Sequence, residues 1–193
     1  MIDKNAPHIK HNPQDIWNSS FMGIGLVQAW QDLMLWEAFI DRVNPGLILE
    51  LGTFTGGMSV FLALHCKAYS AKFLTFDFVD YLDMNNKMMI ESGVVASYRH
   101  LDIFVDQDKV LSELRGAEDP NRPTIFFCDD GNKPREFQTF VPHLRSGDYV
   151  AVHDFGTEFN TLNDVAPVAN LVEEFMTEEC DALKSMTRFY KRM

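Results

Sequence analysis

The fold of this chain is most constrained by a regular alternation of short apolar runs and amphipathic segments. Runs typical of buried strands lie at residues 47–51, 73–76, 98–101, 124–128 and 149–152. Segments with helical spacing lie between them, at residues 58–66, 81–91, 107–114 and 135–144. Strands that alternate with helices build βαβ units, in which neighbouring strands run parallel. We therefore predict an α/β protein of three layers, with helices on both faces of a mostly parallel sheet.

The two ends of the chain extend this arrangement. From residue 28 to residue 43, apolar side chains recur at threes and fours, as on one face of an amphipathic helix. We expect an edge strand at residues 186–191, and a helix at residues 165–179 whose solvated face carries Glu173, Glu174, Glu178 and Glu179. Residues 1–193 are predicted to form a single domain, on which residues 1–45 pack as a helical leader.

Composition and charge exclude several classes of protein. Hydrophobic residues make up 46% of the 193, so the chain can bury one sizeable core. Its net charge of −11 disfavours binding to nucleic acid, whose phosphates attract basic surfaces. Three widely spaced cysteines suit neither a disulfide framework nor a zinc site, and no apolar stretch approaches the roughly 18 residues of a membrane span. We expect a cytoplasmic protein that contacts no membrane.

A glycine-rich loop follows the first predicted strand. The segment Glu50-Leu51-Gly52-Thr53-Phe54-Thr55-Gly56-Gly57 places a carboxylate at the strand end and three glycines before a helix. Ligands of open α/β sheets bind at such strand ends, where glycines let the backbone come close to them. The spacing differs from the Gly-x-Gly-x-x-Gly loop that binds a pyrophosphate, and Glu50 would repel a pyrophosphate but attract a cationic ligand. The loop therefore predicts a ligand without phosphates, although glycines that only pack a turn would give the same pattern.

Acidic residues end the next two strands. A carboxylate after the second strand can accept hydrogen bonds from both hydroxyls of a ribose, and Asp77 occupies that position. Asp80 lies close by and is an alternative, or it caps the following helix. Asp102 closes the third strand, where its side chain can reach an adenine or form an ordinary turn.

Together these segments resemble motifs I and II of class I S-adenosylmethionine-dependent methyltransferases, in the catechol O-methyltransferase-like branch. The upstream segment with Gln28 and Asp32 is similar to a Gln-x-x-x-Asp segment of the cephalosporin hydroxylase and rhamnosyl O-methyltransferase group. The resemblance spans roughly residues 25–155. It implies a Rossmann-like methyltransferase fold and S-adenosylmethionine as the cofactor. The residues expected to hold the cofactor are Glu50, Gly52, Thr53, Phe54, Thr55, Gly56, Gly57, Asp77 and Asp102.

A second group of polar residues follows the fourth and fifth strands, and it consists of Asp129, Asp130, Lys133, His153 and Asp154. Because parallel strands end at one edge of the sheet, these groups should lie beside the bound cofactor. Related methyltransferases carry an acid at the first of these strand ends and two acidic or amide residues at the second, and these hold a divalent cation. The resemblance thus implies that Asp129, His153 and Asp154 hold a cation that binds the acceptor hydroxyl and lowers its pKa, with His153 as a departure from the oxygen ligands of the relatives. Asp130 competes with Asp129 for this role. Imidazole suits zinc, iron or manganese better than magnesium, which leaves the identity of the metal open.

His153 has two other interpretations. Without a metal, it is a general base that takes the proton of an acceptor hydroxyl or amine, while Lys133 binds an anionic group of the substrate. Alternatively, it only makes a hydrogen bond at the strand end.

The sequence thus predicts an S-adenosylmethionine-dependent methyltransferase that acts on a hydroxyl group of a small molecule. Its expected catalytic residues are Asp129, Lys133 and His153. Two rivals are an NAD-type nucleotide-dependent oxidoreductase on a similar sheet and a relative that binds the cofactor without transferring methyl. The acceptor is left open, and so is the oligomeric state, for which a homo-oligomer is one option.

Overall fold

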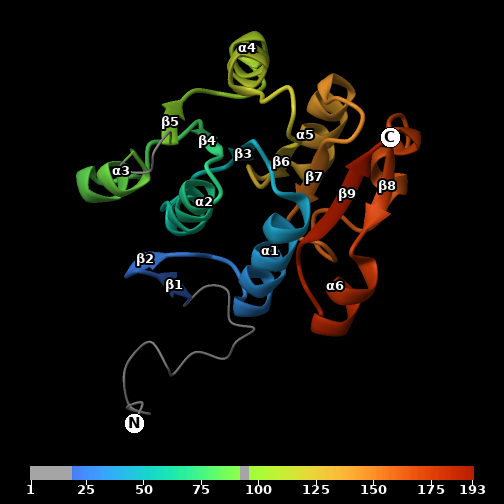
Figure 1. The fold of residues 1–193 in the computed structure, drawn as a ribbon, viewed down its shortest axis with the longest axis horizontal. Helices are drawn as coiled ribbons and strands as arrows, with labels where there is room; N and C mark the ends of the chain where they lie inside the picture. The colour runs from blue at the N-terminus through green and yellow to red at the C-terminus, as the bar shows by residue number, and fades with distance from the viewer. Residues whose placement is uncertain (1–18, 92–95) are drawn as a thin grey trace.

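The computed structural model describes residues 19–91 and 96–193, and its centre is a seven-stranded sheet with the strand order β5-β4-β3-β6-β7-β9-β8 (Figure 1). The parallel strands are β3 (Leu47–Leu51), β4 (Lys72–Asp77), β5 (Ala96–His100), β6 (Thr124–Cys128) and β7 (Tyr149–Val152). The other two, β8 (Val172–Phe175) and β9 (Arg188–Arg192), run antiparallel to their neighbours. The five predicted strands are therefore confirmed, with bounds close to those expected.

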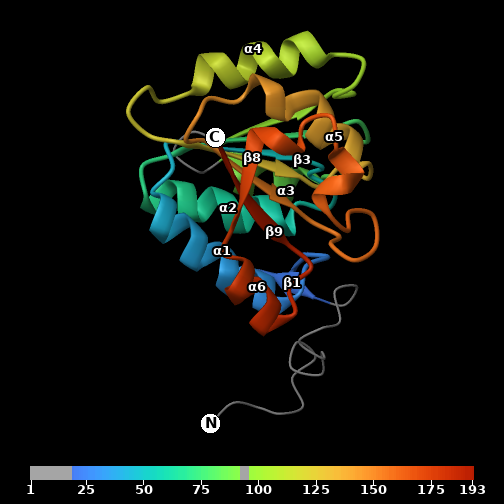
Figure 2. The same ribbon diagram turned by 90° about the vertical axis from the view of Figure 1, so that its right-hand side faces the viewer.

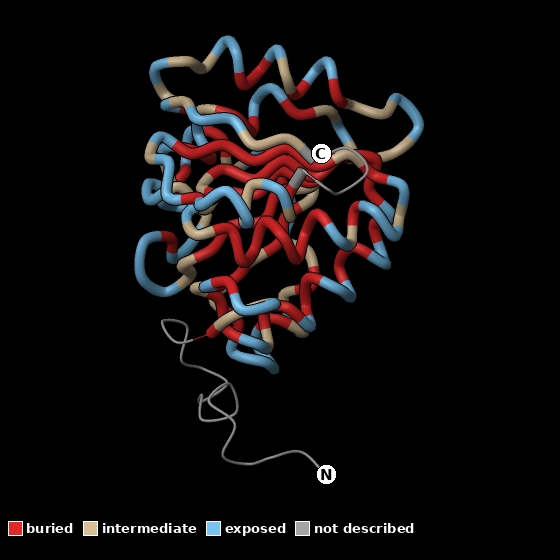
Figure 3. Tube along the Cα trace, turned by 90° about the vertical axis from the view of Figure 1, so that its left-hand side faces the viewer, coloured by how far each residue is buried: buried red, intermediate tan, exposed pale blue. Residues whose placement is uncertain are grey.

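Helices cover both faces of this sheet (Figure 2). One face packs against α1 (Trp30–Val43), α2 (Gly57–Ala68), α3 (Met84–Glu91) and α6 (Thr177–Leu183). The other face packs against α4 (Gln107–Ala117), α5 (Lys133–Phe140) and the short 3-10 helices η3 (Val141–His143), η4 (Leu162–Val165) and η5 (Ala169–Leu171). The strands between these layers are buried (Figure 3), and for this reason β3 and β6 are almost continuously apolar. The predicted three-layer Rossmann-like arrangement is confirmed.

The register of the parallel strands aligns the residues that follow them. Leu51 of β3 pairs with Phe76 of β4 and with Cys128 of β6, and Cys128 pairs with Val152 of β7. The residues that come next along the chain therefore meet at one edge of the sheet, and these are Gly52, Asp77, Asp129 and His153.

The C-terminal region differs from its prediction. The expected helix at residues 165–179 is wrong, because this segment contains η5, strand β8 and only the start of α6. β8 pairs with β9 along its whole length, and this pairing outweighs local helical propensity. The expected edge strand is also corrected, since β9 lies between β7 and β8 and β8 forms the edge. Glu173 and Glu174 are consequently exposed on a strand, whereas Glu178 and Glu179 lie on α6.

The N-terminal region holds an element that was not predicted. A hairpin of β1 (Ser20–Phe21) and β2 (Ile24–Gly25) precedes α1, and Phe21 packs edge-on against Phe61 of α2. Residues 1–18 of the predicted leader lie outside the described residues. Within residues 19–91 and 96–193, every helix is too short or too polar to span a bilayer.

Candidate active site

A cavity of about 690 Å³ opens at the edge of the sheet where the parallel strands end. Its walls are the loops that follow β3, β4, β6 and β7, together with the segment before α1. All of the predicted site residues except Glu50 and Asp102 line it, and they are Gly52, Thr53, Phe54, Thr55, Gly56, Gly57, Asp77, Asp129, Lys133, His153 and Asp154. The structure therefore brings the two predicted halves of the site into one cavity.

The glycine loop forms one wall and packs tightly against the end of β6. Gly52 and Gly56 have φ angles of 91° and 90°, a conformation that is costly for residues with a side chain. A Cβ atom on Gly52 would lie 2.3 Å from the carbonyl oxygen of Asp129. Glycine at position 52 thus lets the loop after β3 and the loop after β6 meet backbone to backbone.

Asp77 is fixed in the wall next to this loop. Its Oδ2 accepts a hydrogen bond from the Phe54 amide at 2.7 Å, and its Oδ1 accepts one from the Val79 amide at 2.9 Å. The side chain is buried beneath the cavity surface, and its remaining lone pairs can accept hydrogen bonds from a ligand. The alternative residue, Asp80, pairs instead with Lys87 at 2.6 Å and does not line the cavity.

Two aromatic residues that the sequence reasoning did not select also border the cavity. Phe78 and Tyr81 are more than half exposed, and the Tyr81 ring lies edge-on to Phe54 with 5.0 Å between ring centroids. The only sequence signal for them is their position just after the acid of the second strand. Exposed aromatic faces of this kind can stack on a planar ligand.

Glu50 and Asp102 do not reach the cavity. Glu50 is fully buried and accepts hydrogen bonds from the hydroxyls of Ser59 and Thr75, the latter at 2.7 Å. Burial raises the pKa of Glu50 to about 8. Asp102 accepts a hydrogen bond from the Phe104 amide at 2.8 Å and so forms a local turn. Their direct contact with the cofactor stays a prediction.

The second half of the site is a cluster of two carboxylates and an imidazole. One possible ligand atom from each of Asp129, His153 and Asp154 lies within 4.8 Å of the others. The Nδ1 atom of His153 is 3.1 Å from Asp129 Oδ1 and 3.4 Å from Asp154 Oδ1. Burial disfavours the imidazolium, but the two carboxylates outweigh it and raise the pKa of His153. Asp130 lies outside this cluster, and burial raises the pKa of its carboxyl to about 8.

Asp154 joins the cluster from an unusual backbone conformation. Its φ of 59° lies in the left-handed region, which is sparsely populated by residues other than glycine. The carbonyl of Asp154 accepts hydrogen bonds from the amides of Thr157 and Glu158, both at 3.1 Å. This tight turn holds the strained backbone in place.

Lys133 brings a positive charge into the same cluster. Its ammonium is 2.6 Å from Asp154 Oδ2, 3.3 Å from Glu158 Oε2 and 3.7 Å from Asp129 Oδ1, although its side chain is only 4% exposed. Burial opposes the charge, but the neighbouring carboxylates outweigh it and keep the pKa of Lys133 above its ordinary value. The carboxylates of Asp129, Asp154 and Glu158 therefore surround the Lys133 ammonium.

The donor set fits a divalent metal. Two carboxylates and an imidazole with ligand atoms this close suit manganese, iron or zinc, and carboxylates alone suit magnesium. Gln28 was noted in the sequence only as part of a resemblance, and its Nε2 donates to Asp129 Oδ2 at 2.9 Å. Gln28 and Lys133 therefore contact different oxygens of the Asp129 carboxylate and together orient it.

The fold and this site define a class of protein. A parallel sheet with a glycine loop after its first strand, an acid after its second and polar residues after its fourth and fifth matches the pattern expected of Rossmann-like S-adenosylmethionine-dependent methyltransferases, although His153 stands where that pattern has an oxygen ligand. The chain belongs to the family described as Rhamnosyl O-methyltransferase/CmcI, whose model matches residues 14–169. The class predicted from the sequence, an S-adenosylmethionine-dependent O-methyltransferase, is thereby confirmed.

Solved structures share the fold. An apo-structure of CmcI has a TM-score of 0.70 and 15% identity, covering 93% of this chain and 78% of that one. A CmcI structure with Mg-SAM has a TM-score of 0.67 and 14% identity, with the same coverage. The O-methyltransferase TomG from Streptomyces achromogenes, in complex with SAM, has a TM-score of 0.53 and 16% identity, covering 86% of this chain and 80% of that one. No curated protein matches the chain.

Proposed function

We propose that this protein transfers the methyl group of S-adenosylmethionine to a hydroxyl group of a small molecule, and that Asp129, His153 and Asp154 prepare that hydroxyl. The observation that carries the proposal is the shared cavity, in which the glycine loop and Asp77 face the same space as the carboxylate-imidazole cluster. The family match supports O-methylation, and the relatives solved with SAM and with Mg-SAM support the cofactor and a metal.

On the cofactor side, Asp77 would accept hydrogen bonds from the ribose hydroxyls. Phe54 and Val79 already hold its carboxylate in place, so little side-chain entropy is lost on binding. The backbone of residues 53–57 would lie along the bound cofactor and contact it. The rim aromatics Phe78 and Tyr81 would cover its planar base.

On the acceptor side, Asp129, His153 and Asp154 would hold the divalent metal. When bound there, the metal lowers the pKa of an acceptor hydroxyl. The acceptor oxygen then attacks the methyl carbon in line, the carbon–sulfur bond breaks, its electron pair stays on sulfur, and the hydroxyl proton passes to solvent. Lys133 would hold Asp129 and Asp154 in position. Holding the reactants in line supplies much of the rate.

The geometry supports a metal-holding role for His153 over that of a general base. Its Nδ1 faces two carboxylates and its Nε2 is buried, so neither ring nitrogen is free to take a proton from a substrate in the cavity. We further propose that the acceptor is not a nucleic acid, because the net charge is −11, and that the protein works in the cytoplasm as a single domain.

Replacing Asp77 tests the cofactor half of the proposal. We expect Asp77→Ala to weaken the binding of S-adenosylhomocysteine by at least about tenfold in calorimetry, since hydrogen bonds to a charged acceptor contribute about 1.5–3 kcal/mol each. Asp77→Asn keeps one acceptor oxygen and should give a smaller loss. Asp80→Asn serves as the control, because it alters only an ion pair with Lys87 that is about one third exposed and a hydrogen bond from Tyr98.

Unchanged affinity in a folded Asp77→Ala protein would refute this placement of the ribose. NAD titrated in the same way separates the oxidoreductase alternative, and we expect no binding. Turnover of a panel of hydroxylated acceptors separates an enzyme from a relative that only binds the cofactor.

A further inference from the structure

Several buried polar atoms of the described residues have no hydrogen-bond partner, and four of them belong to His153 or to residues near it in the hydrogen-bonding pattern. They are Gln28 Oε1, Asp32 Oδ2, His153 Nε2 and Thr187 Oγ1. Unpartnered polar atoms are costly in a protein interior, so each of them indicates an interaction still to be made.

Hydrogen bonds join these residues into two chains, which end within two residues of each other. Gln28 bonds to Asp129, and Asp129 bonds to His153. On the other side, Asp32 Oδ1 accepts hydrogen bonds from the Ser185 hydroxyl and from the Met186 amide at 3.1 Å. The Met186 carbonyl in turn accepts from the Phe155 amide at 2.9 Å, two residues beyond His153. The start of α1 and the segment before β9 are thus joined to the chain two residues beyond His153.

Burial raises the pKa of Asp32, and electrostatic attraction by His153 opposes that rise. Both side chains are buried, so this attraction is only weakly screened by water. The unpartnered Oδ2 of Asp32 is an acceptor, and the unpartnered Nε2 of His153 is a donor whenever it carries a proton.

We propose that Asp32 is the positioning residue of His153, whose Nε2 proton it accepts in a hydrogen bond that one buried water can bridge. The proposal rests on the metal-holding role of His153. A histidine that binds a metal through one ring nitrogen donates the other N–H to a carboxylate or carbonyl, and this bond fixes both the tautomer and the ring orientation. Asp32 would keep the Nδ1 lone pair directed at the space between Asp129 and Asp154.

A purely structural role does not account for a carboxylate at this position. Ser185 and Met186 both donate to the same oxygen, Oδ1, so an asparagine would satisfy them equally well. The second oxygen of Asp32 brings negative charge into the interior, where it is unfavourable unless a donor faces it. His153 is the donor within the group that offers a partly charged N–H.

Asp32→Asn tests this role directly, because the amide keeps the Oδ1 acceptor and replaces Oδ2 by a donor. The amide can face Nε2 only when that nitrogen carries no proton, which places the ring proton on Nδ1 and removes the metal-binding lone pair. We expect Zn²⁺ affinity, measured by calorimetry, to fall about 10–100-fold. Affinity for S-adenosylhomocysteine should stay within about threefold of the wild type, since Asp32 does not line the cavity.

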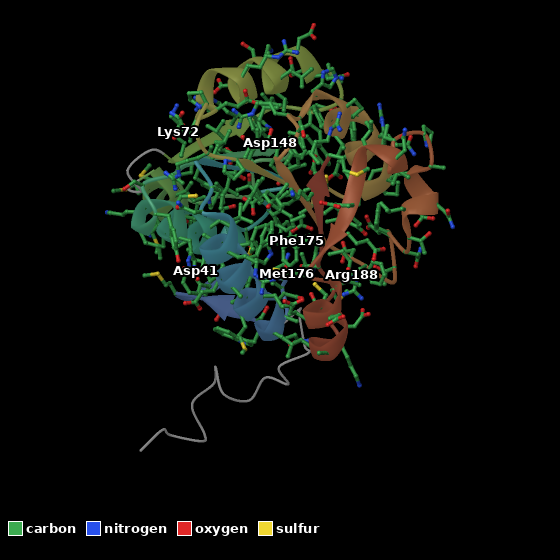
Figure 4. The ribbon with its side chains drawn as sticks, turned by 45° about the vertical axis from the view of Figure 1, so that its right-hand side comes forward. Asp41, Lys72, Asp148, Phe175, Met176 and Arg188 are labelled. Carbon is green, nitrogen blue, oxygen red and sulfur yellow. The ribbon has the colours of Figure 1, made fainter. Side chains whose placement is uncertain are left out.

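Two matched variants separate positioning from stability. Asp148→Asn neutralises another buried carboxylate, which accepts a hydrogen bond from the Thr124 amide. Asp148 precedes β7 at the end away from the site, and Figure 4 shows it well apart from Arg188, which pairs with Val152 at the site end. Ser185→Ala removes a structural partner of Asp32 but keeps its charge. Both should retain wild-type Zn²⁺ affinity. An equal loss in Ser185→Ala would overturn the proposal in favour of a structural role.

Nitrogen-15 NMR of the His153 ring gives a readout that does not need the metal. The signal is assigned by its absence in His153→Gln. We expect Nε2 to carry a proton at pH 7 in the wild type and to lose it in Asp32→Asn. An unprotonated Nε2 in the wild type, or identical ring protonation in both proteins, would overturn the proposal. If the wild type bound no Zn²⁺, the metal part of the proposed function would fail, and the NMR comparison would still decide the role of Asp32.

Discussion

Replacing Lys133 by methionine should destabilise the metal-free protein and make it depend on a divalent metal. Methionine keeps the unbranched apolar stem and removes the ammonium. In the wild type this ammonium lies 2.6 Å from Asp154 and 3.7 Å from Asp129, with only 4% of its side chain exposed. Without it, two neighbouring carboxylates lose their shared cation.

The size of the effect follows from the exposure of these carboxylates. Removing one partner of a buried ion pair costs about 3–5 kcal/mol. The side chains of Asp129 and Asp154 are 14% and 22% exposed, so the cavity solvates part of the remaining charge. Glu158 is 44% exposed and contributes little. We therefore expect a loss of about 2–3 kcal/mol in the free energy of unfolding.

Urea denaturation with EDTA and with Mn²⁺ measures both parts of this prediction. A ligand at 100 times its Kd stabilises the folded state by about 2.7 kcal/mol, enough to offset the loss. Mn²⁺ should stabilise Lys133→Met more than the wild type, in which the metal must compete with the ammonium. Lys87→Met is the control, because its pair with Asp80 is about one third exposed at both ends and should contribute under about 1 kcal/mol. A Lys133→Met protein as stable as the wild type in EDTA, or an equal response of both to Mn²⁺, would refute the reasoning.

Two further predictions concern the end of β3 and the loop that follows it. Burial raises the pKa of Glu50 to about 8 from an ordinary 4.5, so the folded state holds a proton that the unfolded state releases, and this contribution to stability is lost as pH rises from 4.5 through 8. Glu50→Gln should therefore show a flatter stability curve in this window, by at most about 1.4 kcal/mol per pH unit, and curves parallel to the wild type in urea titrations would contradict this origin. Gly52→Ala should lose more than about 2 kcal/mol of stability and bind S-adenosylhomocysteine poorly, because strain at φ 91° adds to a contact of 2.3 Å with Asp129. Gly147→Ala has the same φ with no atom within 4 Å, so it measures the strain alone, and equal losses in the two variants would show that the contact has no effect.

Much of the fold was predictable because the buried strands of the sheet give short, continuously apolar runs in the sequence. Strands covered on both faces must be apolar throughout, and β3 and β6 stand out for that reason. The positions of Asp77, Asp129 and His153 followed from the parallel order, which requires that consecutive strands end on one side. The cavity itself was thus predictable without knowledge of any side-chain contact.

Other features depend on partners that local patterns do not reveal. The sequence of β8 taken alone predicts a helix, and its pairing with β9 makes it a strand. Glu50 stands at a strand end, where its side chain could turn either way, and the hydroxyls of Ser59 and Thr75 draw it into the interior. Asp32 belongs to an amphipathic helix, and its partners lie more than 150 positions away in sequence.

The backbone contact between the loops at Gly52 and Asp129 has a consequence for how such an enzyme can change its substrate. The spacing between the loop that would hold the methyl donor and the loop that carries Asp129 is set there by main-chain atoms, without an intervening side chain that mutation could resize. Exposed positions of the opening beside the cluster, such as Thr157, are free to vary in shape and polarity. Substitutions at the opening can therefore change which acceptor is preferred, while the distance between these two loops stays the same.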